Sequence, residues 1–342
     1  MIKENELKNK KILLIISPFY EYHIRIQETL SNFGCSVTVL YNQLNTVYAY
    51  SQNKIIFLLK YIFRMIDKQD ISKQLEEKYD FVLALGGYTY NEKILKKLKK
   101  NNPNIKTIVY YWDSFYNWKS SYTIDWFDYR YSFDRFDCLR YNNKNLNYLP
   151  LFYINNPLTN RQEETKYDLL YIGSFSPFSL NRIFWLKKIC KEIQKNNIKA
   201  FVYLYCPRIK VSLKEILYCM TSISYFLYAF FAFLFRNEPF VFHDKLSLTV
   251  VKDIVRESKC LLDIPVVNQS GISIGVIEAM ANGNKIITTN ENIKHDKFYR
   301  EENIYILNKK NMKGINDFMK INYLPMDISY LKIENWLKTL LG

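Results

Sequence analysis

Residues 269–290 read QSGISIGVIEAMANGNKIITTN and combine side chains able to bind an anion and a sugar hydroxyl. Gly271 would let a ligand approach the backbone closely, while Ser270 and Ser273 carry hydroxyl donors. A helix is expected to begin near Ser273, so the positive end of its dipole could face a diphosphate. Glu278 lies among apolar residues and could accept two hydroxyls of a ribose, or it could be a solvated helix glutamate.

The elements around this stretch predict a parallel sheet. In the second half of the chain, apolar runs predict strands at residues 167–174, 199–206, 240–243, 260–265, 285–290 and 303–308, with helices near 181–197, 246–258 and 273–281. Such strand–helix alternation is typical of parallel sheets covered on both faces, where ligands bind at the carboxyl ends of the strands. The run CLLDIP ends at residue 265, and only three residues separate it from the opening stretch, which places that stretch at such an end.

The first half of the chain repeats this pattern. Strands are predicted at residues 11–17, 35–41, 79–87 and 105–113, and helices near 22–33 and 91–101. Residues 1–10 are interpreted as a loose tail, and the polar tract at 155–166 as a hinge or linker. Because 342 residues accommodate two ordinary domains, the sequence predicts an α/β protein with Rossmann-like domains at 1–153 and 154–325. Residues 326–342 contain an amphipathic helix.

Charge and composition narrow the class of partner. Lys and Arg total 48 against 33 Asp and Glu, a formal net charge of +15 that favours anionic partners. No nucleic-acid module is recognised, and the aromatic residues lie within apolar runs, so nucleic acid is not the expected partner. Six cysteines without CxxC spacing and only three histidines predict no metal site. The N-terminus lacks the pattern of a signal peptide, so we expect a cytoplasmic protein.

Two apolar segments raise the question of a membrane. Residues 217–235 contain 19 residues without a charge, about 28 Å if helical. The flanking strands are expected to share one sheet, which argues against a crossing and favours either a buried helix or an in-plane membrane helix. Residues 55–66 place Lys60 and Arg64 on one helical face, consistent with a core helix or with membrane contact. Together with the net charge, these segments favour an anionic membrane surface as a partner.

Three titratable side chains follow strands of the first half and are candidate catalytic bases. Glu21 and His23 follow the first strand, and Asp113 ends the run IVYYWD. A general base is needed for an inverting displacement, and each residue would lie at the carboxyl edge of its sheet. An exposed loop residue is the alternative for Glu21 and His23.

The segment from Asp263 to Asn290, with its D-x-P-x-x-x-Q-S-G-I-S-I-G-V-I-E-A-M-A-N-G-N order, resembles the donor-binding region of GT-B glycosyltransferases. The likeness is greatest to bacterial lipopolysaccharide and capsule enzymes. The resemblance implies a GT-B fold in which two Rossmann-like domains face each other across a cleft, with the last helix packing back toward the N-terminal domain. It also implies metal-independent sugar transfer without a cofactor, in which helix ends and basic residues stabilise the leaving diphosphate.

The resemblance also assigns roles to residues. Glu278 would contact the ribose, and a loop at the diphosphate would contain Gln269, Ser270, Gly271, Ile272 and Ser273. The stretch DLLYIGSFSPFSLNR resembles the first strand and loop of the donor domain. It adds further donor-side candidates: Gly173, Ser174 and Arg182, followed at later strand ends by Arg208 and His243. For Arg182 a solvated helix position is the alternative, and for His243 a structural hydrogen bond.

One departure from the family pattern limits the assignment of mechanism. Many retaining members carry two glutamates separated by seven residues, whereas the position eight residues before Glu278 is Ser270. Retention or inversion is therefore not assigned.

The sequence predicts a glycosyltransferase that uses a nucleotide-sugar, with a UDP-sugar favoured. The expected acceptor is a lipid-linked surface glycan such as lipopolysaccharide or capsule, at the cytoplasmic face of the membrane. A non-catalytic GT-B-like scaffold that binds a glycan or a partner protein is the alternative.

Overall fold

The chain divides into two compact units in the computed structural model. Unit 1 comprises Met1–Ile154 and Ser329–Gly342, and unit 2 comprises Asn155–Ile328. The structure describes residues 2–41, 72–86, 92–154, 165–175, 179–208, 219–220 and 223–342. The helix predicted at 55–66 and most of the predicted linker lie outside the described residues.

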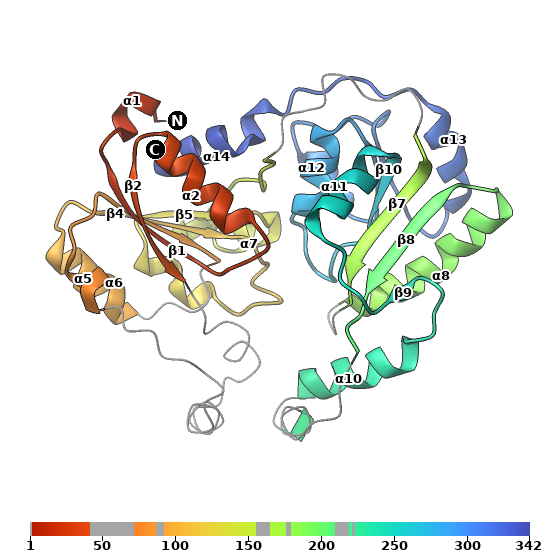
Figure 1. Ribbon diagram of the computed structural model, residues 1–342, viewed down its shortest axis with the longest axis horizontal. Helices are drawn as coiled ribbons and strands as arrows, with labels where there is room; N and C mark the ends of the chain where they lie inside the picture. The colour runs from red at the N-terminus through yellow and green to blue at the C-terminus, as the bar shows by residue number, and fades with distance from the viewer. Residues whose placement is uncertain are drawn as a thin grey trace. The chain divides into compact units, whose positions relative to one another are not determined.

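Unit 1 contains a six-stranded parallel sheet with the order β2-β1-β3-β4-β5-β6 (Figure 1). Its strands are β1 (Lys11–Ile16), β2 (Ser36–Tyr41), β3 (Phe81–Leu85), β4 (Lys106–Tyr111), β5 (Tyr129–Ser132) and β6 (Asn147–Tyr148). All five residues of β3 are buried, as expected for a strand covered on both faces.

Helices cover both faces of this sheet. On one face, α5 (Ser72–Glu76), α6 (Glu92–Asn101) and the 3₁₀ helix η1 (Ser121–Trp126) pack over a buried apolar cluster. On the other face lie α2 (Tyr22–Asn32) and α14 (Ile333–Leu341), and Trp336 of α14 contacts Tyr110 of β4.

The predicted helix at 22–33 ends as its sequence requires. Gly34 adopts a φ of 80°, its N–H donates to Ser31, and the N–H of Cys35 donates to Leu30. These two bonds form a Schellman motif, which needs a residue in the left-handed region and therefore favours glycine.

Two parts of unit 1 differ from the sequence prediction. Residues 1–10 are not a loose tail, because α1 (Glu4–Leu7) buries Leu7 completely and Ile2 donates a backbone hydrogen bond to Lys338. The region 113–148, for which no element was predicted, contains η1, β5, β6 and the helix α7 (Arg135–Arg140). Strands as short as β5 and β6 give too brief an apolar pattern to be recognised in a Tyr- and Asp-rich sequence.

Unit 2 contains a second six-stranded parallel sheet, with the order β12-β11-β10-β7-β8-β9. Its strands are β7 (Tyr167–Ser174), β8 (Ala200–Tyr205), β9 (Val241–Phe242), β10 (Ser258–Asp263), β11 (Lys285–Thr288) and β12 (Ile304–Ile306). The two sheets confirm the prediction of two Rossmann-like α/β halves.

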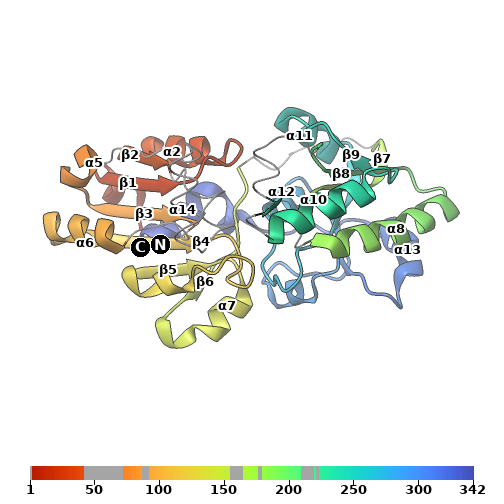
Figure 2. The ribbon, with the colours of Figure 1, turned by 90° about the horizontal axis from the view of Figure 1, so that it is seen from below.

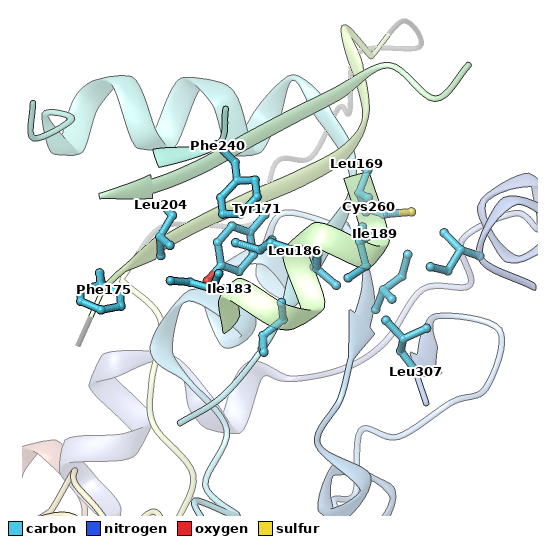
Figure 3. Packing of buried hydrophobic residues seen from close by; sticks show 14 of the residues in the cluster. Leu169, Tyr171, Phe175, Ile183, Leu186, Ile189, Leu204, Phe240, Cys260 and Leu307 are labelled. Atoms are coloured by element: carbon cyan, nitrogen blue, oxygen red, sulfur yellow. The ribbon is translucent and has the colours of Figure 1, made fainter. Parts of the chain in front are cut away.

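Helices again lie on both faces of this sheet. Helix α8 (Leu180–Lys195) lies on the opposite side of the sheet from α11 (Leu248–Arg256), as Figure 2 shows. Together with α13 (Ile315–Lys320), α8 covers the main apolar cluster, in which Ile183, Leu186 and Ile189 pack against the strands (Figure 3). On the α11 side also lies α12 (Ile274–Ala281).

The apolar segment predicted at 217–235 forms the helix α10 (Ile223–Phe235) over part of its length. The strands on either side of it, β8 and β9, pair in parallel and so belong to one sheet, as expected from the sequence. In the part of the chain that the structure describes, no helix has the length and hydropathy to cross a membrane.

The last helix joins unit 1 through one large side chain. Trp336 is fully buried, and its indole N–H donates to the carbonyl oxygen of Pro150 at 3.0 Å. Its ring lies 4.8 Å from that of Tyr110 and 4.5 Å from that of Phe152. The C-terminal segment is thus part of the core of unit 1.

We expect Trp336→Ala to lower the free energy of unfolding by about 3–5 kcal/mol, because it leaves a large cavity. Trp336→Phe retains most of the packing but leaves the Pro150 carbonyl without its donor, so the loss should be about 1–3 kcal/mol. Urea denaturation of the two variants measures both values. Equal losses would contradict the role of the indole hydrogen bond.

Candidate functional site

The carboxyl ends of β10 and β11 are joined by one carboxylate. Asp263, the last residue of β10, accepts a hydrogen bond from Thr288 Oγ1 at 2.8 Å and one from Ser273 Oγ at 3.3 Å. Its backbone oxygen also accepts the N–H of Thr289. Because Ser273 is the N-cap residue of α12, Asp263 positions the start of that helix beside the two strand ends.

The loop between β10 and α12 is held from the end of β11. Asn290 donates from Nδ2 to the carbonyl oxygen of Ser270 at 3.0 Å and to that of Gly271 at 3.4 Å. Gln269 donates to the same Gly271 oxygen at 3.4 Å, and Asn268 adopts a left-handed φ of 60°. The side chain of Ile272 is buried, so only its backbone could serve a ligand. The predicted diphosphate loop therefore has a fixed backbone.

Helix α12 presents a narrow accessible face. Five of its eight residues are buried, namely Val276, Ile277, Ala279, Met280 and Ala281. The remaining positions, Ile274, Gly275 and Glu278, lie three and four residues apart and therefore share one face. A Cβ built at Gly275 would meet no atom within 4 Å, so this face is open at the first turn. Glu278 lies one turn further along it.

Gly283 and Asn284 form the C-terminal cap of α12. Gly283 has a φ of 74° and donates to Met280, and Asn284 donates through its backbone to Ala279, which forms a Schellman motif. The side chain of Asn284 donates to the carbonyl of Ser258 at 2.6 Å, which anchors the turn to the start of β10.

Arg182 joins two loops at the same edge of the sheet. Its Nε donates to the carbonyl of Ile264 at 2.7 Å and its Nη1 to that of Ser174 at 2.8 Å. Arg182 therefore bridges two loops, a role that differs from both the donor-side contact and the solvated helix position considered from the sequence. Its guanidinium places a positive charge next to the last residue of β7, where an anion could bind.

Tyr171 of β7 was not among the site residues predicted from the sequence. Its ring is 2% exposed and packs between Leu186 and Phe240 (Figure 3). Its hydroxyl is buried without a hydrogen-bond partner among the described residues. A Cβ built at Gly173 would lie 2.5 Å from that hydroxyl, so the glycine leaves the space that the phenol occupies. A buried hydroxyl without a partner costs about 1–3 kcal/mol, a cost that a ligand acceptor could remove.

The electrostatics of this edge follow from burial. Burial raises the pKa of Asp263, while the hydrogen bond from Thr288, the charge of Arg182 and the hydrogen bond from Ser273 lower it. Burial also raises the pKa of the Tyr171 phenol to about 12, against a lowering by Arg182. The phenol is therefore a hydrogen-bond donor at neutral pH.

Two further predicted donor residues lie at neighbouring strand ends. Arg208 follows β8 and is exposed. His243 follows β9, and its Nδ1 lies 2.7 Å from the carbonyl oxygen of Cys206. Because a carbonyl only accepts, Nδ1 carries the proton, which gives His243 the structural hydrogen bond considered as its alternative.

The three candidate bases lie at the carboxyl edge of the unit 1 sheet. Glu21 is exposed at the start of α2, and His23 lies in its first turn with a buried Nδ1 that has no partner among the described residues. Asp113 follows β4. The rings of Phe19 and Trp112 lie 6.3 Å apart, so the loops after β1 and β4 are neighbours.

Asp113 has the electrostatics of a base that titrates near neutral pH. The residue is half-buried, and desolvation of its carboxyl raises the pKa from 3.8 to about 7. At the same edge, the N–H of Phe115 donates to Asp137 at 2.7 Å, which fixes the turn after Asp113. Within the described ranges, no group of three His, Cys, Asp or Glu side chains could hold a metal ion.

Signals for the missed residues at the ends of β10 and β11 were present in the sequence. Asp263 is a charged residue at the end of an apolar strand, and Thr288 and Asn290 end the strand that follows α12. The hydrogen bonds among them depend on strand pairing, which places β10 beside β11 with Asp263 opposite Thr288. Tyr171 gave no signal, because an aromatic residue inside an apolar strand is ordinarily part of the core.

Solved structures share this fold. The α,α-trehalose 6-phosphate synthase from Burkholderia multivorans aligns at a TM-score of 0.53 and 8% identity, over 97% of this chain and 93% of that one. The α,α-trehalose-phosphate synthase (UDP-forming) from Burkholderia vietnamiensis aligns at 0.50 and 7% identity, over 97% and 93%. TarM aligns at 0.44 and 14% identity over 85% of this chain, which spans 53% of the TarM chain. No protein-family model and no curated protein matches the sequence.

The two parallel sheets and the alignment over nearly the whole chain identify a GT-B fold, as the resemblance of the donor segment implied.

We expect Asp113→Asn to flatten the dependence of stability on pH between about 4 and 7. The folded pKa of about 7 lies above the ordinary value of 3.8. Asp113 therefore stabilises the fold at low pH, and this contribution is lost as the pH rises toward 7, at about 1.4 kcal/mol per pH unit at most. Urea denaturation across this range measures the slope. The exposed Asp125 in the same unit provides the control Asp125→Asn, and an unchanged slope in Asp113→Asn would contradict the burial of this carboxyl.

We expect Tyr171→Phe to leave the ligand-free protein as stable as the wild type or more stable, because the hydroxyl that is removed has no described partner. Tyr110→Phe is the matched control, since the Tyr110 hydroxyl is buried and donates to the carbonyl of Leu149 at 3.0 Å. That control should lose about 1–2 kcal/mol in chemical denaturation. Equal losses in the two variants would show that the Tyr171 hydroxyl is bonded within the protein.

Proposed function

We propose that this protein is a glycosyltransferase that transfers a sugar from a nucleotide diphosphate donor to a surface-glycan acceptor. The observation that carries the proposal is the accessible face of α12. There an open first turn and Glu278 lie on one side of a helix that Asp263 fixes at the carboxyl edge of the sheet.

The geometry of unit 2 suits a nucleoside diphosphate. The N-terminus of α12 offers backbone N–H groups and a positive dipole to the diphosphate, and Arg182 adds a fixed positive charge nearby. Glu278 lies one turn from that N-terminus, a spacing that suits a ribose whose diphosphate lies at the helix start. The Tyr171 hydroxyl, which lies beside Gly173 near the end of β7, would donate a hydrogen bond to the ligand.

The comparison with solved structures supports a UDP-sugar as the donor. The enzyme from Burkholderia vietnamiensis is described as UDP-forming, and it aligns over nearly all of this chain. At 7% identity the likeness concerns the fold, so the choice of UDP is a proposal that nucleotide binding must test.

Asp113 is the candidate that best fits a general base in unit 1. A carboxyl with a pKa of about 7 is half deprotonated at neutral pH, so it can accept a proton from an acceptor hydroxyl. Glu21 and His23 lie at the start of α2, which follows the neighbouring loop, and are the remaining candidates. We propose no metal or cofactor, since the helix N-terminus and Arg182 can stabilise the leaving diphosphate.

The proposed acceptor is a lipid-linked glycan of the lipopolysaccharide or capsule type. It would be used at the cytoplasmic face of the membrane. The net charge of +15 supports a partner rich in anionic groups, as lipid head groups and phosphorylated glycolipids are.

The donor site is tested by nucleotide binding. UDP, GDP, dTDP and CMP are compared by thermal shift, and we expect UDP to raise the melting temperature by several degrees at about 100 times its Kd. Glu278→Ala should weaken UDP binding about tenfold to a hundredfold in isothermal titration, because a charged hydrogen-bond acceptor is lost.

Glu301→Ala provides the matched control. Glu301 is an exposed glutamate that precedes β12 and so lies toward the opposite edge of the same sheet. It should bind UDP as the wild type does. If no nucleotide shifts the melting temperature, or if Glu278→Ala binds UDP unchanged, the donor site is not where we propose it.

A further inference from the structure

Helix α10 exposes a continuous apolar stripe. Large side chains recur along it at intervals of three and four residues and are 41–80% exposed: Ile223, Phe226, Leu227, Phe230, Phe233 and Leu234. Met220, just before the helix, is also 80% exposed. This spacing puts the stripe along one side of the helix, where each side chain lies one turn from the next.

The other side of α10 is packed against unit 2. Ala232 is buried in the main apolar cluster, and Tyr228, Phe231 and Phe235 pack against it. The ring of Tyr228 lies 5.6 Å from that of Phe175, which directly follows β7. The helix is therefore attached at the carboxyl end of the sheet (Figure 1). Its exposed stripe lies on the side that does not pack against the core.

The helix lacks the polar face of an ordinary surface helix. Residues 223–235 contain no charged side chain, and the only polar groups are one serine and two tyrosine hydroxyls. A soluble protein rarely leaves so large a set of adjacent apolar side chains in water, because each contributes an unfavourable exposed area. The stripe therefore marks an interaction surface.

The chemistry of the stripe favours a lipid surface over a protein partner. Interfaces between proteins surround their apolar centre with a polar rim that makes hydrogen bonds, and the stripe offers almost no such groups. A bilayer accepts a convex row of Phe, Leu and Ile side chains without a complementary groove.

Positive charge lies at the end of this stripe. The guanidinium of Arg236 lies 3.7 Å from the ring of Phe233, and the side chain is exposed. An arginine in that position can reach lipid phosphates while its stem covers apolar surface. With a chain charge of +15, an anionic surface is favoured over a neutral one.

We propose that α10 is a membrane-docking helix that inserts its exposed stripe into the head-group region of an anionic bilayer. The packed core of unit 2 takes the place of the polar face that an isolated interfacial helix would carry. The inference deepens the proposed function, on which it rests for the use of a lipid-linked acceptor.

Co-sedimentation of the full chain with vesicles tests the proposal. Wild-type protein should bind vesicles of phosphatidylglycerol and phosphatidylcholine and bind pure phosphatidylcholine more weakly. The double variant Phe230→Glu/Leu234→Glu should reduce the partition coefficient at least tenfold, because two inserted side chains become charged.

A matched variant controls for the change in charge. Phe136 and Leu139 of α7 are 50% and 75% exposed, so Phe136→Glu/Leu139→Glu adds the same two charges on another helix. We expect this variant to bind vesicles within about threefold of the wild type, since these two residues lie outside the stripe and their replacement removes no inserted apolar area. Thermal melting of both variants verifies that they fold.

Three results would overturn the proposal. They are a wild type that binds neither vesicle, an α10 variant that binds as the wild type does, and equal losses in the two double variants. A wild-type dimer that becomes a monomer in Phe230→Glu/Leu234→Glu, without vesicle binding, would assign the stripe to a second copy of the chain.

Titration of the same proteins with UDP separates this proposal from the proposed function. Vesicle binding without UDP binding would support the docking helix and contradict the donor site. UDP binding without vesicle binding would support the donor site and contradict the docking helix.

Discussion

The hydrogen bonds of Asp263 are the interaction on which the site in unit 2 depends. One carboxylate fixes the ends of β10 and β11 and the N-cap residue of α12, so the helix begins at a defined point on the sheet edge. Its burial is unfavourable to the ionised form, and the hydroxyls of Thr288 and Ser273 offset part of that cost. Without the carboxylate, those two hydroxyls would also lose their acceptor.

The same carboxylate constrains what can bind there. A diphosphate at the start of α12 would bring negative charge toward Asp263, and two like charges in a partly desolvated site repel. Arg182 and the positive end of α12 would reduce this repulsion, because each stabilises negative charge on Asp263 and on the diphosphate alike. A raised pKa eases the conflict further, because a carboxyl that accepts a proton as the anion approaches no longer repels it.

The sequence predicts the fold better than the site. The elements of the fold follow from local patterns, whereas the site depends on contacts between residues that are far apart in the sequence. Apolar periodicity and Gly34 or Gly283 at helix ends are local, and they predicted most of the strands and helices around both sheets. The contacts of Asp263 and Asn290 need strand pairing. The position of the Tyr171 hydroxyl, which has no partner among the described residues, needs the full packing of the core. In the same way, the N-terminal ten residues lacked a periodic pattern, yet Leu7 is buried by tertiary contacts.

The position of α10 relates the apolar stripe to the chemistry of unit 2. The helix follows β8, packs on Phe175 after β7, and so lies at the edge of the sheet where Asp263 and Arg182 are found. Parallel strands place all their carboxyl ends on one edge, and a segment inserted between β8 and β9 must emerge there. A bilayer that bound the stripe would therefore also lie close to the carboxyl edge of the sheet. For the proposed lipid-linked acceptor this arrangement would be an advantage, because a hydroxyl near the bilayer surface would already lie near the proposed donor site.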